Sequence, residues 1–580
     1  MDAILIMVVA FVGYLLAYRL YGRFLGKKIF ALSTANKTPA VEYEDGKDYV
    51  PTKKGIIFGH HFTSIAGTGP IVGPAIGIIW GWVPALIWVL VGTIVMGAVH
   101  DFGSLVISMR NQGKSISEVT SQYINKRTRT IFFLIVLLEL WIVIAVFGLV
   151  IAVIFSMYPA AVFPVWMEIP IAILLGWAIY KKGWNHNVFA IVAIIAMYVT
   201  IVIGYFLPLN MPTIAGIPPT GVWSIILLIY AFIASTLPVT TLLQPRDYIN
   251  SHELLIAMGL LIIGVFVAGF SGKLNVVAPA AQIRPEGAPS MWPFLFITIA
   301  CGAISGFHSL VSSGTSAKQV KTEDDAMAVG YGSMLAEGFL ATLVIVAVAA
   351  GIGMAYTTAD GAMLTGVAAW THHYASWSAA AGLGSKVAAF VVGGANIIGS
   401  FGIPVGIGIV IMGVFVASFA GTTLDTATRL QRYVVQELGS DAKINFLQEK
   451  YTATAVAVIS AGVLAFATGA SGNGALTLWP LFGAVNQTLA ALALITITNY
   501  LRKKGGVKWL VTGIPGIFMV IMTIWGLIEN ERNFIASGNI LLTVVNLIVI
   551  VIASWIVVEG VTAFAKKSGI EPDIKPTAAS

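Results

Sequence analysis

Charged residues are scarce in this sequence. Only 10% of its 580 residues are Asp, Glu, Lys or Arg, whereas 58% are hydrophobic. A soluble globular domain carries about 25% charged residues, so the deficit excludes an ordinary soluble protein. The formal net charge of +7 comes from Lys and Arg clustered in short loops between apolar runs. That distribution excludes the broad basic face of a nucleic-acid-binding domain.

Cysteine is nearly absent as well, because Cys301 stands alone. A single cysteine excludes an intramolecular disulfide and any Cys-rich metal site. The sequence also lacks a Walker A glycine–lysine loop and an HExxH motif, which argues against ATP-driven transport and against a metalloprotease. The first apolar run has no basic residues before it and no small-residue cleavage site after it. We therefore predict a retained helix there, not a signal peptide.

Long apolar runs are abundant and recur to about residue 563. A run of 18 or more apolar residues crosses a hydrocarbon core about 30 Å thick, whereas outer-membrane strands alternate over roughly ten residues. The sequence thus predicts an all-α polytopic membrane protein. We expect about fifteen spans: 3–25, 58–79, 83–109, 130–156, 162–180, 187–207, 222–243, 253–272, 293–316, 327–356, 388–418, 451–470, 477–500, 509–528 and 538–563. The Gly- and Pro-rich segment 388–418 fits one long helix or two short ones.

Basic residues concentrate in alternate loops. Segments 19–54 and 110–129 are rich in Lys and Arg, whereas 157–161, 208–220 and 471–476 carry none. The positive-inside rule then predicts a multi-pass protein of the cytoplasmic membrane, with the N-terminus outside and the C-terminus cytoplasmic. The predicted parts are an N-terminal helix and loop (1–57), two core repeats (58–207 and 222–418), C-terminal helices (451–563) and a cytoplasmic tail (564–580).

The stretch 59–82, GHHFTSIAGTGPIVGPAIGIIWGW, combines several glycines and prolines. A membrane helix of this composition cannot keep its hydrogen bonds intact, and a break is tolerated only where protein or a watery cavity satisfies the backbone. Transporters bind substrates and ions at such breaks near the middle of the bilayer. We predict that Gly67, Thr68, Gly69 and Pro70 bind substrate. The alternative is a kink that serves close helix packing.

A second predicted interruption lies at 235–247, around Pro238, with Arg246 close behind it. Four predicted spans separate it from the first, which is the interval between the first and sixth helices of a five-plus-five inverted repeat. We predict that Pro238 and Arg246 also contribute to the substrate site, with Arg246 binding a carboxylate. The alternative is an ordinary proline kink.

Hydroxyl groups gather in the stretch 302–317. Ser312, Ser313 and Thr315 are candidate ligands of a coupling cation. Such hydroxyls often bond back to their own helix instead. Further along the chain, Asp425 and Arg429 are four residues apart, which favours a surface salt bridge between them. We also predict that Asn486 forms hydrogen bonds between helices.

Ionisable residues inside spans are rare and are usually functional or paired. A rise of about 1.5 Å per residue places several of them at a similar depth in the cytoplasmic halves of their helices. Together they fit a proton relay, a metal site such as zinc, or structural pairs. These candidates are His60, His61, Asp101, Glu139, His308 and Glu337, with His100 beside them.

Four motifs resemble the carbon starvation protein family of bacterial and archaeal transporters: GHHFTSIAGTGPIVGP (59–74), HDFGSLVISMRNQGKSI (100–116), SGFHSLVSSGTSAKQ (305–319) and WPLFGAVNQTLAA (479–491). The resemblance implies uptake of peptides or pyruvate and membership of the amino acid–polyamine–organocation group. It also implies a LeuT-type five-plus-five core, with one extra N-terminal helix and about four extra C-terminal helices.

We therefore expect a secondary active transporter that imports small carboxylates or short peptides, driven by a proton or sodium gradient. Peptides and pyruvate both remain open as substrates. The expected partners are the substrate and the lipid bilayer, with no nucleic acid and no certain cofactor beyond a bound cation (H⁺, Na⁺ or zinc). The alternatives are a channel, an intramembrane metal-binding enzyme and a sensor. We predict that the protein is not an enzyme.

Overall fold

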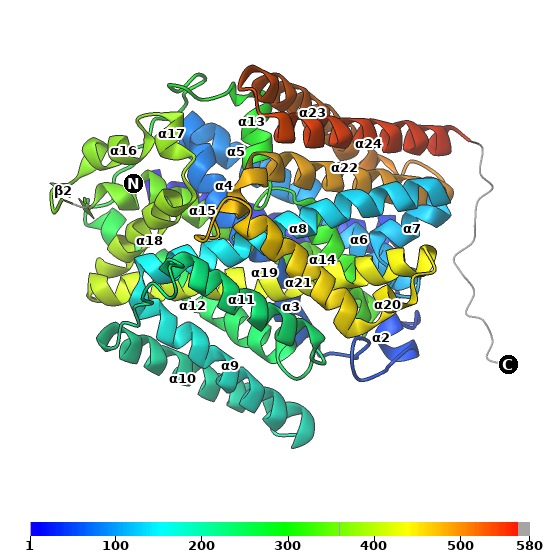
Figure 1. Cartoon of the computed structure of the whole chain (residues 1–580), viewed down its shortest axis with the longest axis horizontal. Helices are drawn as coiled ribbons and strands as arrows, with labels where there is room; N and C mark the ends of the chain where they lie inside the picture. The colour runs from blue at the N-terminus through cyan, green and yellow to red at the C-terminus, as the bar shows by residue number, and fades with distance from the viewer. Residues whose placement is uncertain (1, 359, 567–580) are drawn as a thin grey trace.

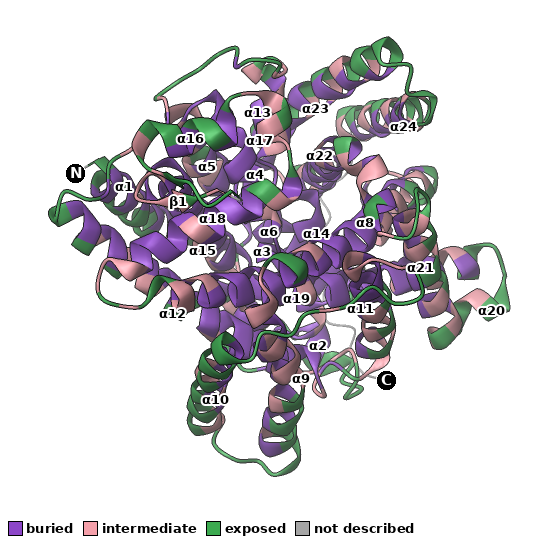
Figure 2. Ribbon diagram, turned by 60° about the vertical axis from the view of Figure 1, so that its left-hand side comes forward, coloured by how far each residue is buried: buried purple, intermediate pink, exposed green. Residues whose placement is uncertain are grey.

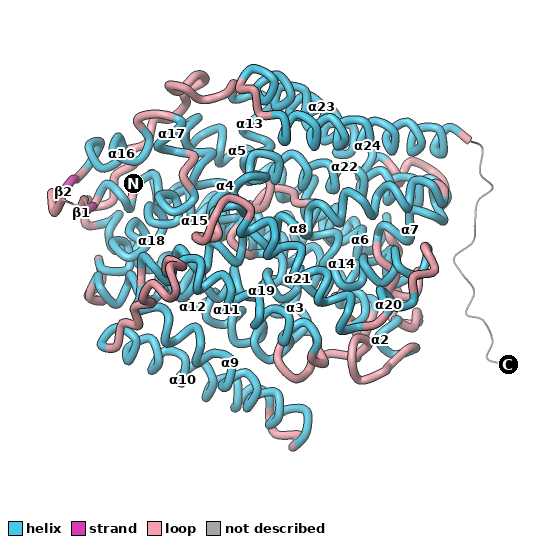
Figure 3. Tube along the Cα trace, viewed as in Figure 1, coloured by secondary structure: helices cyan, strands magenta, loops and turns pink. Residues whose placement is uncertain are grey.

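The computed structural model describes residues 2–358 and 360–566, and helices form most of this part (Figure 3). Within the described residues, twelve helical segments are long and apolar enough to cross a membrane, or thirteen if the bent pair Lys54–Ala66 and Gly69–Trp80 counts as one span. This confirms an all-α protein with many spans. The predicted tail, 564–580, lies almost entirely outside the described residues.

The α-helices have the following bounds: α1 (Asp2–Ala17), α2 (Pro39–Glu42), α3 (Lys54–Ala66), α4 (Gly69–Gly77), α5 (Trp82–Gly92), α6 (Ala98–Arg110), α7 (Ile116–Tyr123), α8 (Lys126–Met157), α9 (Val162–Gly176), α10 (His186–Phe206), α11 (Pro219–Thr236), α12 (Leu243–Phe270), α13 (Met291–Thr298), α14 (Gly306–Gly314), α15 (Ser333–Ala349), α16 (Gly366–Tyr374), α17 (Trp377–Ala380), α18 (Leu383–Gly399), α19 (Val405–Asp441), α20 (Asn445–Gln448), α21 (Lys450–Phe466), α22 (Trp479–Lys503), α23 (Leu510–Ala536) and α24 (Ile540–Ala565). Strands β1 (Tyr356–Thr357) and β2 (Met363–Leu364) form a short antiparallel hairpin.

The two longest helices, α8 and α19, pack against each other in the middle of the bundle (Figure 1). Helices α9 and α10 pair at one edge, and α23 and α24 pair at the opposite edge. Short helices α2, α7 and α20 lie at one end of the bundle, with the Lys- and Arg-rich loops. We call this end the basic side. Helices α16 and α17 and the β-hairpin lie at the other end, which we call the opposite side.

Burial follows the pattern of a protein that faces lipid. Exposed residues lie on the outer helices and buried residues fill the interior (Figure 2). The exposed residues include many large apolar side chains, and the buried residues include many polar ones. Helix α10 exposes Val188, Ile191 and Ile195, and α23 exposes Ile514 and Ile517. Apolar faces of this size on a monomer indicate contact with a membrane or another protein, and here they lie on the outer, membrane-length helices.

The first predicted interruption is present. Helices α3 and α4 are bent by 41°, and Gly67 between them has a backbone conformation outside the helical region (φ 14°, ψ −147°). Gly69 lies so close to Cys301 that a Cβ atom would overlap its side chain. Glycine at position 69 therefore weakens the helix and also allows the close approach of Cys301.

The second interruption lies elsewhere than predicted. The expected span 293–316 is broken between α13 and α14, at 299–305, where Gly302 has φ +87° and packs on Pro70. By contrast, Pro238 lies in the connection 237–242 between two separate spans, α11 and α12. A residue before proline disfavours the helical conformation, and Leu237 is extended (ψ 154°). This proline therefore ends a span and does not interrupt one.

Other predicted segments also differ in detail. The segment 388–418 contains parts of two helices, α18 and α19, separated at 400–404. The predicted spans 58–79, 293–316 and 451–470 are bent, broken or short, which accounts for the difference between fifteen predicted spans and the twelve straight ones.

Candidate functional site

A cavity of ≈ 710 Å³ lies where the two interruptions meet. Its floor includes Thr68 and Gly69 at the start of α4, together with Ala300 and Cys301 in the α13–α14 break. Phe147 of α8 also contributes. Each interruption frees backbone N–H and C=O groups from helical hydrogen bonds. The floor of the cavity therefore presents polar backbone groups in the interior of the bundle.

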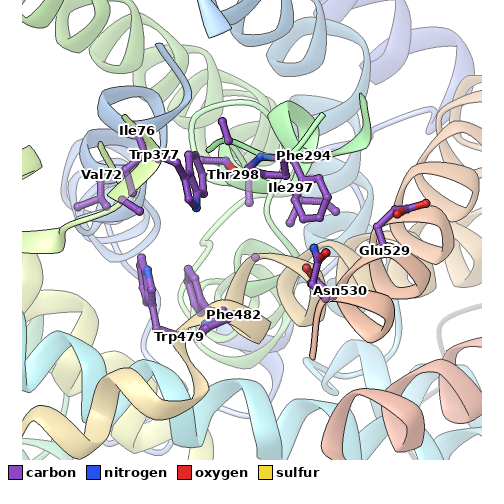
Figure 4. A pocket seen from close by; sticks show the side chains of 18 of the residues that line it. Val72, Ile76, Phe294, Ile297, Thr298, Trp377, Trp479, Phe482, Glu529 and Asn530 are labelled. Carbon is purple, nitrogen blue, oxygen red and sulfur yellow. The ribbon is translucent and has the colours of Figure 1, made fainter. Parts of the chain in front are cut away.

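Aromatic side chains form much of the remaining wall (Figure 4). Trp377 of α17 approaches from one side, and Trp479 and Phe482 of α22 from another. Helix α23 adds Asn530 and Glu529. Glu529 is the one charged side chain among the described residues that line the cavity, and it also pairs with the exposed Arg532 at 2.8 Å.

The mouth of the cavity lies on the opposite side of the bundle. Residues 287–290 line it, together with Trp377 and the last turns of α23. The positive end of the α4 dipole faces the interior of the cavity, because Thr68 is the N-cap of α4 and Gly69 its first residue. Helix N-termini favour anionic groups. The cavity thus offers a carboxylate near its mouth and a helix N-terminus on its floor.

Two of the predicted substrate residues therefore line the cavity, and the others lie around it. Gly67 packs against Thr423 of α19, and Pro70 packs against Gly302. Pro238 lies in the α11–α12 connection on the basic side. Arg246 does not line the cavity but lies in a separate ionic cluster.

Buried carboxylates surround Arg246. Its guanidinium lies 2.5 Å from Asp425, 3.5 Å from Glu168 and 3.9 Å from Asp247, and it donates a hydrogen bond to Tyr230. The void beside this cluster measures ≈ 30 Å³, which is about the volume one water molecule occupies in the liquid. The positive charge is thus already compensated by protein, and no substrate fits beside it in this conformation.

His60 belongs to the same cluster. Its Nδ1 lies 2.5 Å from Asp247, and its Nε2 lies 3.1 Å from Gln319. We call the five residues Arg246, Asp247, Glu168, Asp425 and His60 the arginine cluster. They tie α3, α9, α12 and α19 together between the cavity and the basic side.

A polar segment, 43–53, crosses the bundle on the basic side. Asp48 lies 2.8 Å from Arg429 and accepts a hydrogen bond from Tyr433 at 2.7 Å. Burial alone would raise the pKa of Asp48, but Arg429, Tyr433 and Lys318 more than offset that effect, and the pKa lies below its usual value. Backbone bonds from Val50 and Thr52 to the chain after α14 hold the same segment in place. These contacts hold the segment against α19 and against the chain after α14.

The expected surface pair of Asp425 and Arg429 is not formed. Both side chains are buried, and each has a different partner: Arg246 for Asp425 and Asp48 for Arg429. The spacing of four residues places them on one face of α19, but that face is turned into the bundle. Tertiary contacts therefore decide the partners.

A second buried cluster lies beside the α13–α14 break. His308 Nδ1 lies 3.0 Å from Asp101, and His308 Nε2 lies 3.4 Å from Glu337. Asp101 also contacts His100 at 2.8 Å. The other oxygen of Glu337 accepts a hydrogen bond from the Gly302 amide at 3.1 Å. We call Asp101, His100, His308 and Glu337 the histidine cluster.

The remaining predicted ionisable residues lie outside this cluster. His61 Nδ1 lies 2.8 Å from Ser316. Glu139 is fully buried in α8, and neither of its oxygens has a hydrogen-bond partner among the described residues. No group of three or more His, Cys, Asp or Glu residues in the described ranges is arranged to hold a metal ion.

The three predicted cation ligands interact mainly with their own surroundings in α14. Ser313 donates to the Ser309 carbonyl at 2.6 Å, and Thr315 donates to the Val311 carbonyl at 3.1 Å. Ser312 has a buried hydroxyl that finds no partner in the described part of the chain. The bonds of Ser313 and Thr315 match the alternative in which the hydroxyls satisfy their own helix, and Ser313 also accepts a hydrogen bond from the Ile116 amide at 2.9 Å.

The hydroxyls that contact the end of α3 come instead from α19. Thr423 donates to the Ser64 carbonyl at 3.4 Å, and Thr426 lies 3.3 Å from the Ser64 hydroxyl. The run of threonines at 422–428 was a usable signal in the sequence. Asn486 of α22 accepts hydrogen bonds from Ser305 and from the Phe307 amide at 3.1 and 2.9 Å, which confirms its predicted role between helices.

The chain is similar to one sequence family and to several named transporters. A sequence model of the family described as Carbon starvation protein CstA matches residues 2–526. Peptide transporter CstA of Campylobacter jejuni is 34% identical, over 93% of this chain and 82% of its own length. Peptide transporter CstA of Bacillus subtilis is 31% identical, over 98% of each chain.

A relative with another printed substrate also matches. Pyruvate/proton symporter BtsT of Escherichia coli is 32% identical, over 91% of this chain and 81% of its own length. Among solved structures, MhsT in complex with L-phenylalanine matches with a TM-score of 0.47 and 13% identity, over 82% of this chain and 98% of that chain. With a family model that covers most of its length and relatives that match nearly end to end, this chain belongs to the carbon starvation protein family.

Proposed function

We propose that this protein is a secondary active transporter that imports short peptides by alternating access. The observation that carries this proposal is the cavity of ≈ 710 Å³, which reaches both helix interruptions and has its mouth on the opposite side of the bundle. We infer that the arginine cluster and the 43–53 segment, both held by ion pairs, close the other side in this conformation. A site near the middle of the bilayer with one open entrance is what a carrier requires in one of its two end states.

The direction of transport follows from the basic loops. Because Lys- and Arg-rich loops remain on the cytoplasmic side of a membrane, the basic side is cytoplasmic and the mouth of the cavity faces outward. The N-terminus then lies outside. In this conformation the protein is ready to accept substrate from the exterior, which supports uptake.

The size of the cavity favours peptides over pyruvate. Pockets of roughly 300–1,000 Å³ hold ligands of drug size, and a cavity of ≈ 710 Å³ lies within that range. A keto acid as small as pyruvate would leave most of this volume to water. A short peptide with apolar or aromatic side chains would instead contact Trp377, Trp479 and Phe482.

The charges of the cavity favour the same choice. No Lys or Arg is among the described lining residues, and Glu529 is a carboxylate. Pyruvate would therefore meet a like charge and find no cationic side chain. A peptide is a zwitterion: its amino group complements Glu529, and its carboxylate complements the N-terminus of α4.

Uptake by the purified protein in liposomes tests this proposal. We expect a labelled dipeptide with an aromatic side chain to accumulate above its equilibrium level under an inward ion gradient, and labelled pyruvate to accumulate much less. Unlabelled dipeptide should compete and make the uptake saturable. Accumulation of pyruvate without that of any dipeptide would contradict the peptide assignment, and absence of both would contradict the transporter assignment.

A further inference from the structure

The histidine cluster contacts the break that lines the cavity through the Gly302 amide and through Cys301. Glu337 of α15 accepts a hydrogen bond from the Gly302 amide, and Cys301, the neighbour of Gly302, lines the cavity. The carbonyl of Gly302 is held as well, by a hydrogen bond from Thr93 at 2.8 Å. The conformation of the α13–α14 break therefore depends directly on the acceptor strength of one carboxyl group.

The cluster lacks positive charge. Asp101, Glu337 and His308 are all 0% exposed. Even with His308 protonated, two carboxylates face one cation, and neither carboxylate has a Lys or Arg within ion-pair distance among the described residues. An uncompensated charge in a dry interior is costly. Binding one further proton would remove that charge, so the cluster is built to take up a proton.

The remaining polar neighbours do not supply the missing charge. On α6, His100 faces Asp101, and on α3, His61 lies near Asp101 and His308. Cys301 approaches His308 from the break itself. Tyr14 of α1 and Thr93, which precedes α6, lie beside the next residue after Glu337, Gly338. None of these groups carries a permanent positive charge.

The arginine cluster differs in this respect. Its carboxylates surround Arg246, whose charge is permanent. Glu139 differs in another way, because nothing among the described residues connects it to either interruption by a hydrogen bond. Of the buried carboxyl groups in the predicted layer, Glu337 is the one that combines missing positive charge with a bond to the cavity floor.

We propose that Glu337 and His308 form the proton-binding site that couples transport to a proton gradient, and that the Gly302 amide transmits the protonation state to the substrate cavity. A carboxylate accepts a charge-assisted hydrogen bond from Gly302, and protonation weakens that bond. Gly302 packs on Pro70 at the start of α4, so a change at this glycine reaches both interruptions. The inference rests on the proposed transport function and adds the coupling ion and its site.

The test separates proton coupling from transport itself. In Glu337→Gln, the amide oxygen still accepts the Gly302 hydrogen bond and the volume is kept, but the side chain cannot bind or release a proton. We expect this variant to lose accumulation of labelled dipeptide driven by an inward proton gradient. It should retain exchange of external labelled dipeptide for internal unlabelled dipeptide, because exchange needs no net movement of protons.

Proton movement is measured directly in the same vesicles. A pH-sensitive dye trapped inside wild-type liposomes should report acidification when dipeptide is added outside. Liposomes with Glu337→Gln should show no acidification. Glu253→Gln is the matched control, because Glu253 is a buried carboxyl group on α12 that lines neither the cavity nor the histidine cluster. It should behave as the wild type in both assays.

Other outcomes decide against the proposal. Proton-driven accumulation by Glu337→Gln, or wild-type accumulation that follows a sodium gradient and causes no acidification, would overturn it. Loss of coupling in Glu253→Gln as well would also overturn it. If Glu337→Gln does not fold, Glu337→Asp keeps an ionisable group, and dipeptide-induced acidification must then persist. Failure of the wild type to transport any dipeptide would instead contradict the proposed function.

Discussion

The arginine cluster and the histidine cluster are built from the same kinds of residues, yet they differ in charge and in location. In the arginine cluster a permanent cation, Arg246, lies among carboxylates, and the cluster joins helices between the cavity and the basic side. In the histidine cluster a titratable imidazole bridges Asp101 and Glu337, beside the break that lines the cavity.

The difference shows how one class of side chain serves two purposes. In the arginine cluster the permanent charge of Arg246 joins α9, α12 and α19 through ion pairs. A buried cluster without such a cation changes its charge when a proton arrives. Buried ionisable residues in a membrane protein are thus distinguished by what compensates them, more than by their depth.

The largest effect on stability is expected from Arg246→Met. The change leaves Asp425, Glu168 and Asp247 buried without their cation, and removal of one partner of a buried ion pair costs about 3–5 kcal/mol. Thermal unfolding in detergent should show a marked loss of stability. Lys54→Met is the control, because Lys54 is 56% exposed where it pairs with Asp325, and an exposed pair contributes about 0–1 kcal/mol. Equal stability of the two variants would contradict the structural role of the arginine cluster.

A smaller loss of stability but a severe loss of transport is expected from Gly302→Ala. A Cβ atom there would lie 2.8 Å from that of Ala341 and would add strain at φ +87°. Backbone strain of this kind costs about 1–3 kcal/mol. The control is Gly216→Ala, because Gly216 has φ +80° but no atom within 4 Å of the position that a Cβ atom would take.

Both dipeptide exchange and proton-driven accumulation are measured for the two glycine variants. Gly302→Ala should reduce both, because it disturbs the floor of the cavity. Gly216→Ala should lower stability through a similar backbone strain at positive φ, and it should leave transport intact. Normal transport by Gly302→Ala would mean that the break at 299–305 does not transmit between the histidine cluster and the cavity.

An intermediate effect is expected from Asp48→Asn. The change weakens the bonds from Arg429 and Tyr433 to Asp48 on the basic side. We expect the free energy of these bonds to fall by about 1 kcal/mol or less, because Asp48 is partly exposed. The state that is open to the basic side should become more populated, and a cysteine-reactive probe applied from that side should then reach a cysteine placed at Thr68 more quickly. An unchanged labelling rate would show that the 43–53 segment is not a gate.

The sign of the pH effect on this bond follows from the lowered pKa of Asp48. Because the folded-state pKa lies below the unfolded value of about 3.9, the bond contributes fully above that value and is lost as the pH falls through the folded-state pKa. The wild-type labelling rate should therefore be insensitive to Asp48 titration near neutral pH. Any pH dependence there belongs to other groups.

The smallest effect is expected from Glu529→Gln. If Glu529 binds the amino group of a peptide near the mouth of the cavity, its loss should raise KM for a dipeptide about three- to tenfold, the range expected for one partly exposed charged contact, with little change in stability. Glu531→Gln is the matched control on the same helix, because Glu531 contacts Asn546 and does not line the cavity. Equal KM values for the two variants would exclude Glu529 from substrate binding.

Part of the fold and part of the site were readable in the sequence. The interruption at Thr68–Gly69 was predicted correctly because several glycines and prolines within a few residues disrupt a helix locally. The interruption at 299–305 was missed, since its signal is weaker: Gly302 and Gly306 are separated by residues that also suit a helix. Pro238 gave a stronger local signal, but it ends a span and does not interrupt one.

The pairing of ionisable residues was not readable. The sequence placed Asp101, Glu139, His308 and Glu337 in one layer, whereas the structure joins Asp101, His308 and Glu337 and leaves Glu139 outside their cluster. Helical spacing gives the depth of a side chain but not the direction it faces relative to other helices. For the same reason Asp425 and Arg429 were expected to pair with each other.

The sequence by itself determined the membrane class, the family and the first interruption, because apolar run length, long local motifs and glycine–proline chemistry act over neighbouring residues. Only the tertiary structure decided which carboxylates share Arg246 and which share His308, and which aromatic residues from α17 and α22 meet at the cavity. These partners are far apart in the chain, and they meet through the rotation and packing of whole helices, which no local pattern encodes.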